Sequence, residues 1–349
     1  MSIQSILDSA IDNAPKNTGI AATYTSAPGS STLDFGCSGN IINDKTSEPM
    51  TLDADTAFEM GSISKTFTTL LCFAIDQAQG GTQLDAPLSD FIEGLPSNIA
   101  PLTIGSLLSY VSGLPQDDPP DPNDPDHPKG VEYPYDVCAM VDFLTSPGIT
   151  VDSPGSFAYS NLGFSLAGIA TPGMNAGMRQ PGNDDLTTGF ASLLSSTVLQ
   201  ASSIDMPATH FYSPADDASL PKGPNGPTNP TWPAQDGGGG LVTTLTDMGN
   251  WLRFNMGLAT NATLSPLLTK IFAPQSTTPK GVTTDYAWFE SSVGSLDITW
   301  KAGGEPSFSS WIGFTSTAPQ LGVVVWTNMV KGPAQSTGAR ILQWLAANG

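Results

Sequence analysis

The sequence predicts an α/β fold of the α+β type, in which an antiparallel sheet flanked by N- and C-terminal helices carries a large helical insertion. Three observations predict it. Strand-like segments lie near both ends of the chain, within residues 18–42 and 291–328. Segments with helical spacing occupy the middle, between residues 82 and 280. The outermost segments, 3–13 and 334–347, have the pattern of amphipathic helices.

The N-terminal part supplies one strand pair and one buried helix. Residues 18–25 and 31–42 are rich in β-branched and aromatic residues and flank a turn-forming stretch, so we expect an antiparallel pair. Residues 62–79 have apolar side chains all round, which predicts a buried helix. Gly80 and Gly81 end that helix.

The middle of the chain combines short helices with long loops. Residues 115–134 contain seven prolines and five aspartates, so they cannot form a helix or a central strand. We expect an ordered surface loop or a flap there; its acidic spacing fits no EF-hand calcium loop. The predicted helices of this part are 104–110, 137–144, 162–169, 189–199 and 246–256.

The C-terminal part returns to strands at 291–301, 309–315 and 322–328. We expect these strands to join the N-terminal pair in one sheet. The expected division is therefore a sheet domain of residues 1–60 plus 285–349 and a mainly helical domain of residues 61–284, with the active site between them.

The charge balance excludes several classes of partner. There are 12 Lys and Arg against 32 Asp and Glu, which gives a formal net charge of −20. So few cations cannot form the basic face that nucleic acids or anionic membranes require. No apolar stretch approaches the length of a membrane span, and no leader is visible. The low-lysine composition favours a secreted or periplasmic mature protein, with a cytoplasmic location open.

The three cysteines predict neither a zinc site nor a redox pair, because no C-x-x-C is present. Cys72 lies in an apolar run and is expected in the core. A disulfide between Cys37 and Cys138 stays open.

Familiar metal and cofactor motifs are missing as well. The two histidines, His127 and His210, are far apart, and there is no H-E-x-x-H, G-x-S-x-G or P-loop. The run Gly237–Gly240 has no phosphate-binding lysine beside it. We therefore expect no metal and no cofactor.

One candidate for nucleophilic chemistry opens the buried helix. Ser62 and Lys65 are three residues apart and so share one helix face. A serine hydroxyl needs a base to take its proton, and a lysine in apolar surroundings can supply or assist one. An N-cap serine with a solvated lysine is the alternative, but Lys65 lies inside an apolar helix where a charge is costly.

Two further clusters can complete such a site. Tyr159 and Asn161 are two apart, so both can point the same way in an extended segment. A tyrosine near lysines can act as a general base, and an asparagine can bind a substrate amide and a lysine together. Lys301 is followed by Gly303 and Gly304, whose backbone can approach a substrate closely. A simple hairpin turn is the alternative for this last cluster.

Together the three clusters resemble the motifs of the penicillin-recognising serine hydrolases. The S-x-x-K tetrad, Y-x-N and a K-T-G-like triplet occur in this order in the branch of class C β-lactamases, D-alanyl-D-alanine carboxypeptidases and β-lactamase-like (family VIII) esterases. The framing segments 58–67, 107–115, 154–163 and 238–244 are similar to the family's, the second to "LLTHTSGLP" and the last to "GGLVST". The resemblance implies a β-lactamase/transpeptidase-like fold.

The resemblance also implies roles for individual residues. Ser62 would be the nucleophile, Lys65 its partner and Tyr159 the general base. The backbone N–H groups of Ser62 and Gly304 would form the oxyanion hole. The implied substrate-binding residues are Asn161, Lys301 and Gln116.

Two departures from the family pattern bear on the substrate. The third motif is K-A-G, and Ala302 lacks the hydroxyl that helps to hold a substrate carboxylate. Residues 171–185 replace a stretch where relatives have a continuous helix. The resemblance implies an acyl-Ser62 enzyme, with β-lactamase-type activity first. A carboxylesterase, a D-amino-acid peptidase or amidase, a transacylase and a non-catalytic binding module are the alternatives.

Overall fold

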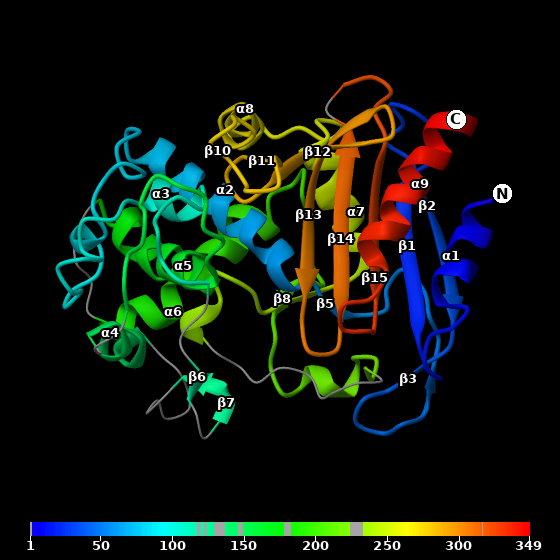
Figure 1. The fold of residues 1–349 in the computed structure, drawn as a ribbon, viewed down its shortest axis with the longest axis horizontal. Coiled ribbons are helices and arrows are strands. Elements are labelled where there is room, and N and C mark those ends of the chain that lie inside the picture. Colours follow the sequence, from blue (N-terminus) through cyan, green and yellow to red (C-terminus); the bar gives the residue numbers. More distant parts are fainter. Residues whose placement is uncertain are drawn as a thin grey trace.

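Strands from both ends of the chain form one eight-stranded antiparallel sheet (Figure 1). Its order is β10-β11-β12-β13-β14-β15-β1-β2. The strands are β1 (Gly19–Thr25), β2 (Leu33–Gly39), β10 (Ser276–Thr277), β11 (Thr283–Thr284), β12 (Phe289–Val293), β13 (Leu296–Gly304), β14 (Ser309–Thr315) and β15 (Gly322–Thr327). The computed structural model describes residues 2–116, 120–121, 124–128, 137–145, 149–177, 183–223, 233–315 and 317–349.

Helices cover both faces of this sheet and fill the middle of the chain. The α-helices are α1 (Ile3–Ile11), α2 (Ser64–Ala78), α3 (Ile104–Leu108), α4 (Val137–Thr145), α5 (Asn161–Asn175), α6 (Asn183–Leu194), α7 (Leu245–Asn255), α8 (Leu268–Ile271) and α9 (Ala334–Asn348). Short helical turns are η1 (Gly61–Ile63), η2 (Leu88–Asp90), η3 (Ser195–Leu199), η4 (Asp216–Ala218), η5 (Pro233–Gln235) and η6 (Ser265–Leu267).

Small strand pairs lie outside the main sheet. They are β3 (Ile41–Ile42) with β4 (Pro49–Met50), β9 (Leu241–Thr243) between β5 (Phe58–Glu59) and β8 (His210–Phe211), and β6 (Pro120–Asp121) with β7 (Asp124–Pro128). The pair β6–β7 belongs to the Pro/Asp-rich segment 115–134, most of which lies outside the described residues.

The predicted fold class is confirmed. Helices α1 and α9 pack on one face of the sheet, and the helical part of the chain lies on its other side (Figure 1). Strand alternation divides the core accordingly: Trp311 and Val323 face α1 and α9, while Ile312 and Val324 face the helical side. Because both faces are covered, every residue of β14 and β15 is buried.

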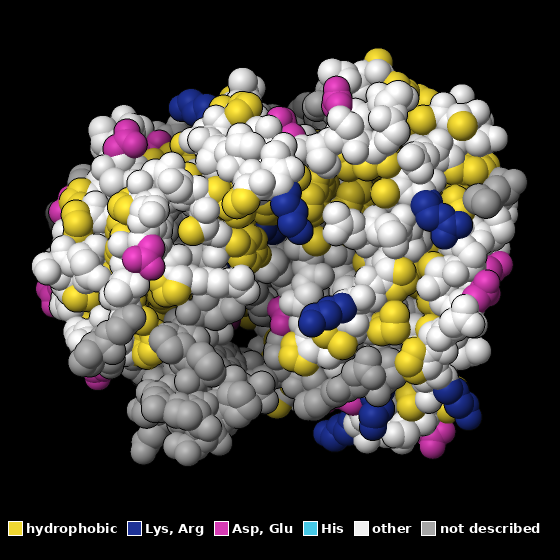
Figure 2. Space-filling view, in the orientation of Figure 1, with side chains coloured by type: hydrophobic (Ala, Val, Ile, Leu, Met, Phe, Trp, Pro, Cys, Tyr) yellow, Lys and Arg dark blue, Asp and Glu magenta, His cyan; other side chains and the backbone are white. Residues whose placement is uncertain are grey.

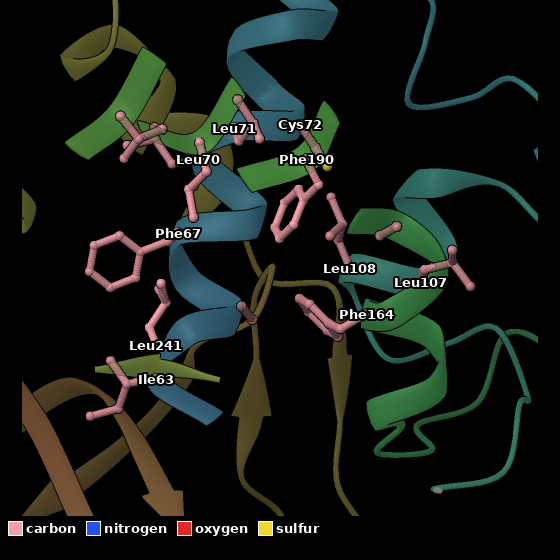
Figure 3. Packing of buried hydrophobic residues seen from close by; sticks show 14 of the residues in the cluster. Ile63, Phe67, Leu70, Leu71, Cys72, Leu107, Leu108, Phe164, Phe190 and Leu241 are labelled. Atoms are coloured by element: carbon pink, nitrogen blue, oxygen red, sulfur yellow. The ribbon is translucent and has the colours of Figure 1, made fainter. Parts of the chain in front are cut away.

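The buried helix α2 is the centre of the helical side (Figure 3). Phe67, Leu71 and Cys72 are wholly buried there, and α3 and α5 pack beside them, with Phe164 of α5 among the neighbours. The expected core position of Cys72 is therefore confirmed. All three cysteines are free thiols, so Cys37 and Cys138 are not paired.

Two predicted boundaries are wrong for identifiable reasons. Residues 291–301 are not one strand, because Gly294, with φ of 64°, begins a two-residue turn between β12 and β13. Helix α5 runs past residue 169 to Asn175 with Pro172 inside it. Pro172 cannot donate to the carbonyl of Gly168, but the Thr171 hydroxyl does so at 2.8 Å and keeps that oxygen bonded.

Two further predictions also differ from the structure. Residues 31–42 divide into β2 of the main sheet and β3, which pairs with β4, and the helix expected at 189–199 begins at Asn183 as α6 and continues into the π-helical turn η3. The remaining predicted helices and strands are confirmed to within a few residues. We propose the same division of the chain into residues 1–60 plus 285–349 and residues 61–284. The short strands β10 and β11 precede residue 285 and extend the sheet at its edge.

Candidate active site

The N-terminal end of α2 meets the end of β13 at a place where two backbones touch. A Cβ on Gly303 would lie 1.9 Å from the carbonyl oxygen of Met60, and a Cβ on Gly61 would lie 2.6 Å from the amide nitrogen of Gly304. Gly61 also has φ of 58°, a conformation that disfavours side chains. These glycines therefore let the residue after Gly61 lie against the backbone of Gly304.

Ser62 is that residue, and two side chains approach its hydroxyl. The ammonium of Lys65 donates a hydrogen bond to Ser62 Oγ at 3.0 Å. The hydroxyl of Tyr159 donates to the same oxygen at 2.8 Å. Ser62 itself is half-buried, so its hydroxyl is accessible from one side.

Lys65 is completely buried, and oxygen atoms surround its ammonium. Besides Ser62 Oγ, it donates to Asn161 Oδ1 at 2.6 Å and to the backbone carbonyl of Gly238. Three acceptors match the three N–H donors of an ammonium, which offsets the cost of burying the charge. The run Gly237–Gly240 thus has a role in the site: it turns a carbonyl toward Lys65.

Tyr159 and Asn161 lie at the start of α5, which explains why both reach the Ser62–Lys65 pair. Ser160 is the N-cap of this helix; its hydroxyl accepts from the Gly163 amide at 2.9 Å and donates to the Pro115 carbonyl at 2.6 Å. Tyr159 thus ends the extended segment and Asn161 begins the helix. The structure brings both side chains to the Ser62–Lys65 pair.

Lys301 extends into the site from β13, on the side opposite to Lys65 of α2. It is 1% exposed, and its ammonium donates to the Tyr110 hydroxyl. It also lies 4.8–4.9 Å from the ring centres of Tyr110, Tyr159 and Phe289, which are cation–π distances. Burial, and then the charge of Lys65, lowers the pKa of Lys301 well below its usual value.

The two remaining predicted positions differ in what they bring to the site. Gly304 lies on a stretch of β13 that β12 leaves unpaired, since the β12–β13 ladder ends at Trp300. Its backbone is exposed and adjoins Gly61. Gln116 has an exposed side chain, and its backbone carbonyl accepts from the Asn161 amide at 2.6 Å.

A cavity of about 710 Å³ opens in front of Ser62, and the space-filling view is hollowed near its centre (Figure 2). Its walls combine aromatic, glycine and a few charged residues: Ser62, Tyr159, Phe289, Trp300, Lys301, Ala302, Gly303, Gly304, Glu305, Pro306, Ser309, Ser310, Val330, Lys331, Gly332, Ala334 and Gln335. A cavity of this size accommodates a small molecule.

Three residues that contribute to the site were not predicted from the sequence. Tyr110 and Phe289 flank Lys301, and Ser160 fixes the start of α5. The sequence carried a signal for one of them, because Ser160 precedes an apolar helical run as an N-cap does. Tyr110 and Phe289 have the pattern of core aromatics.

The part of the chain that the structure describes has neither a membrane-spanning helix nor a cluster of metal-binding side chains. None of the helices in this part of the chain has the length and apolar composition that a membrane crossing requires. Nor do His, Cys, Asp and Glu side chains gather there in groups of three or more that could hold a metal ion.

Comparison with protein families gives one match over most of the chain. The beta-lactamase family model matches residues 35–348. A curated relative, beta-lactamase-like protein 2 of Dictyostelium discoideum, is 31% identical over 133 residues. That match covers 36% of this chain and 23% of the relative, so the chain matches less than a quarter of that protein's length.

Solved structures show the same fold at low sequence identity. A class C beta-lactamase from Rhodobacter sphaeroides superposes with a TM-score of 0.77 at 20% identity, covering 99% of both chains. A beta-lactamase/D-alanine carboxypeptidase from Pseudomonas syringae gives 0.77 at 18% identity, covering 99% of this chain and 98% of the other. An octameric penicillin-binding protein homologue from Pyrococcus abyssi gives 0.76 at 18%, covering 99% and 77%.

Proposed function

The chain belongs to the beta-lactamase family, and from this premise we propose that it is a serine hydrolase that cleaves an amide or ester through an acyl-Ser62 intermediate. One observation carries the proposal: Ser62 Oγ lies within hydrogen-bond distance of both Lys65 Nζ and the Tyr159 hydroxyl. A nucleophile with two proton-transfer partners at its oxygen is the arrangement that acyl transfer requires.

The proposed reaction proceeds in two halves. Tyr159, as phenolate, takes the proton of Ser62 while Oγ bonds to the substrate carbonyl carbon. The resulting oxyanion is held by the amides of Ser62 and Gly304, and its collapse breaks the bond to the leaving group, which receives the proton. Water then attacks the ester with Tyr159 again as base, and Ser62 regains its proton as the acid product leaves.

Lys65 and Asn161 have distinct proposed parts in this sequence. The Lys65 ammonium favours the phenolate form of Tyr159 by its positive charge and guides the proton between the two oxygens. Asn161 accepts a hydrogen bond from Lys65 through its Oδ1 and so orients that lysine, and we propose that its amide group also contacts the substrate. Gln116 is proposed to assist from the cavity rim.

β-Lactamase-type activity is the first specific activity that we propose. The second candidate is hydrolysis of esters that carry no carboxylate, and the methyl side chain of Ala302 in the cavity wall favours it. A small-molecule substrate fits the cavity in either case. An exported location is proposed from the composition alone.

The proposal is tested by the mass of the intact protein after mixing with a penicillin, with phenyl acetate and with a fluorophosphonate. We expect a covalent adduct on the wild type and none on Ser62→Ala. Ser64→Ala is the matched control, because Ser64 is a buried serine two residues away, at the start of α2. An equal adduct on Ser62→Ala, or no adduct with any reagent, would refute the acyl-Ser62 mechanism.

A penicillin adduct that vanishes in seconds as product appears would identify a β-lactamase. An adduct that persists for hours, or one that forms only with the ester, would favour the second candidate.

A further inference from the structure

Tyr110 has a backbone conformation that is unusual for a bulky residue. It follows the end of α3 with φ of 60°, in the left-handed region where glycine is ordinarily found. Its side chain is completely buried. Such a conformation persists where the surrounding contacts determine it, and it often accompanies a functional constraint.

The phenol of Tyr110 is fixed from two sides. Its hydroxyl donates to the carbonyl of Ala287 at 3.1 Å and accepts a hydrogen bond from the ammonium of Lys301. Ala287 is itself left-handed, with φ of 67°, and its amide donates to the carbonyl of Leu108 at 2.9 Å. Two residues with left-handed backbone therefore hold the Tyr110 hydroxyl next to the Lys301 ammonium.

The Tyr110 ring is also the middle of an aromatic stack. It lies parallel to Tyr159 at 5.0 Å and to Phe289 at 5.7 Å between ring centres. These three rings, which we call the aromatic box, surround the Lys301 ammonium at 4.8–4.9 Å. The ammonium of Lys301 therefore already has favourable contacts within the protein, with the aromatic box and with the Tyr110 hydroxyl.

A substrate carboxylate gains little from Lys301, because the protein already surrounds this cation. To pair with Lys301 it must draw the ammonium out of the box and away from Tyr110, which exchanges one set of favourable contacts for another. The neighbouring residue, Ala302, has no hydroxyl to add a hydrogen bond. An uncharged substrate incurs neither penalty.

We infer that Tyr110 is a positioning residue that holds Lys301 against Tyr159, and that it thereby makes the site select acyl substrates without a carboxylate on the leaving group. The inference rests on the proposed acyl-Ser62 mechanism, and of the two proposed activities it favours the second, hydrolysis of esters without a carboxylate, over β-lactamase activity. In this inference the positive charge of Lys301 acts on the Tyr159 oxygen and does not bind a substrate carboxylate.

The test compares two esters with the same acetyl group, phenyl acetate and 3-acetoxybenzoate, which differ in one carboxylate on the leaving group. We expect wild-type kcat/KM to favour phenyl acetate. In Tyr110→Phe, which keeps the ring and removes the hydroxyl, we expect this preference to fall by about 10-fold, the equivalent of one charge-assisted hydrogen bond. The change should come mainly from a lower KM for 3-acetoxybenzoate.

A second variant guards against misfolding. Phe289→Leu opens the aromatic box without touching the Tyr110 hydroxyl, and we expect the preference to fall in the same direction. Tyr24→Phe is the matched control, since it removes a tyrosine hydroxyl from β1, outside the cavity lining; its preference should equal that of the wild type.

Labelling of Ser62 by a fluorophosphonate counts the competent enzyme in every sample and separates the two proposals. If the wild type is not labelled, the proposed function fails and this inference fails with it. If labelling is normal but both variants keep the wild-type preference, or lose activity on both esters equally, Tyr110 has a structural role alone and the inference is overturned.

Discussion

Lys65 lies on the helical side of the site and Lys301 on the sheet side, and their ammonium groups have different surroundings. Lys65 donates to the oxygens of Ser62, Asn161 and Gly238. Lys301 has the aromatic box and one phenol hydroxyl. Both side chains are buried.

The difference teaches how one fold gives two jobs to the same residue type. An ammonium that contacts Ser62 Oγ and an amide oxygen is placed to assist the proton transfer that we propose. An ammonium among rings is placed to influence a neighbouring charge, because ring faces attract a cation but accept its hydrogen bonds poorly. We therefore expect the two lysines to respond differently to substitution.

Replacement of Lys65 should have the larger effect. Lys65→Ala removes the hydrogen bond to Ser62 and the charge that favours the Tyr159 phenolate in the proposed mechanism, so we expect kcat/KM to fall by about 10³–10⁴ for any acyl substrate. Single-turnover acylation of Ser62 measures it. Lys16→Ala, which removes an exposed lysine, is the control. A loss below about 10-fold would show that Tyr159 alone serves as the base.

Replacement of Lys301 should be milder. Lys301→Met keeps most of the length of the side chain and removes its charge, while the hydrogen bonds of Ser62 with Lys65 and Tyr159 remain. We expect kcat/KM for phenyl acetate to fall by about 10–100-fold, the lower range for one electrostatic contributor. If Lys301→Met were as damaging as Lys65→Ala, the distinction between the two lysines would be lost.

A substitution at Ala302 should weaken the inferred preference for substrates without a carboxylate. Ala302→Thr adds a hydroxyl to the cavity wall, and we expect about a 10-fold gain in kcat/KM for a penicillin, with no gain for phenyl acetate. Ala302→Val has the same shape without the hydroxyl and should show no gain. An equal gain in both variants would attribute the effect to shape.

The sequence predicted the sheet and the polar half of the site because both depend on local patterns. Strand alternation and helical spacing are read over a few residues, and Ser62, Lys65, Tyr159 and Asn161 stand in short motifs. The aromatic box could not be predicted, because Tyr110 and Phe289 meet only through the tertiary fold. A buried aromatic residue has the same pattern in a core and in a site.

The local errors have a similar origin. Pro172 predicts a break in a helix, yet the hydroxyl of its neighbour Thr171 replaces the missing donor. The sequence pattern predicts one long strand across Gly294, because the segments on both sides of this residue have strand composition. In each case a single residue determines whether the helix or strand continues, and the pattern of the neighbouring residues predicts the opposite.

Asp285 extends the comparison to a buried carboxyl group. It is completely buried, and neither carboxylate oxygen has a hydrogen-bond partner among the described residues. Burial, and then the charge of Glu290, raises its pKa to about 8. Asp285 is therefore mainly protonated, and so uncharged, in the folded protein near pH 7.

This difference makes stability depend on pH with a definite sign. Between about pH 4, where the unfolded carboxyl ionises, and pH 8, the folded state holds a proton that the unfolded state has released, so wild-type stability falls as pH rises. Asp285→Asn is neutral at every pH. We expect its Tm to match the wild type within about 2 °C at pH 4 and to exceed it by several degrees at pH 8. Asp297→Asn, at an exposed site on β13, is the control and should show no such widening. A Tm difference that stays constant across this range would mean that Asp285 is ionised in the fold, and that burial without partners does not suffice here to neutralise a charge.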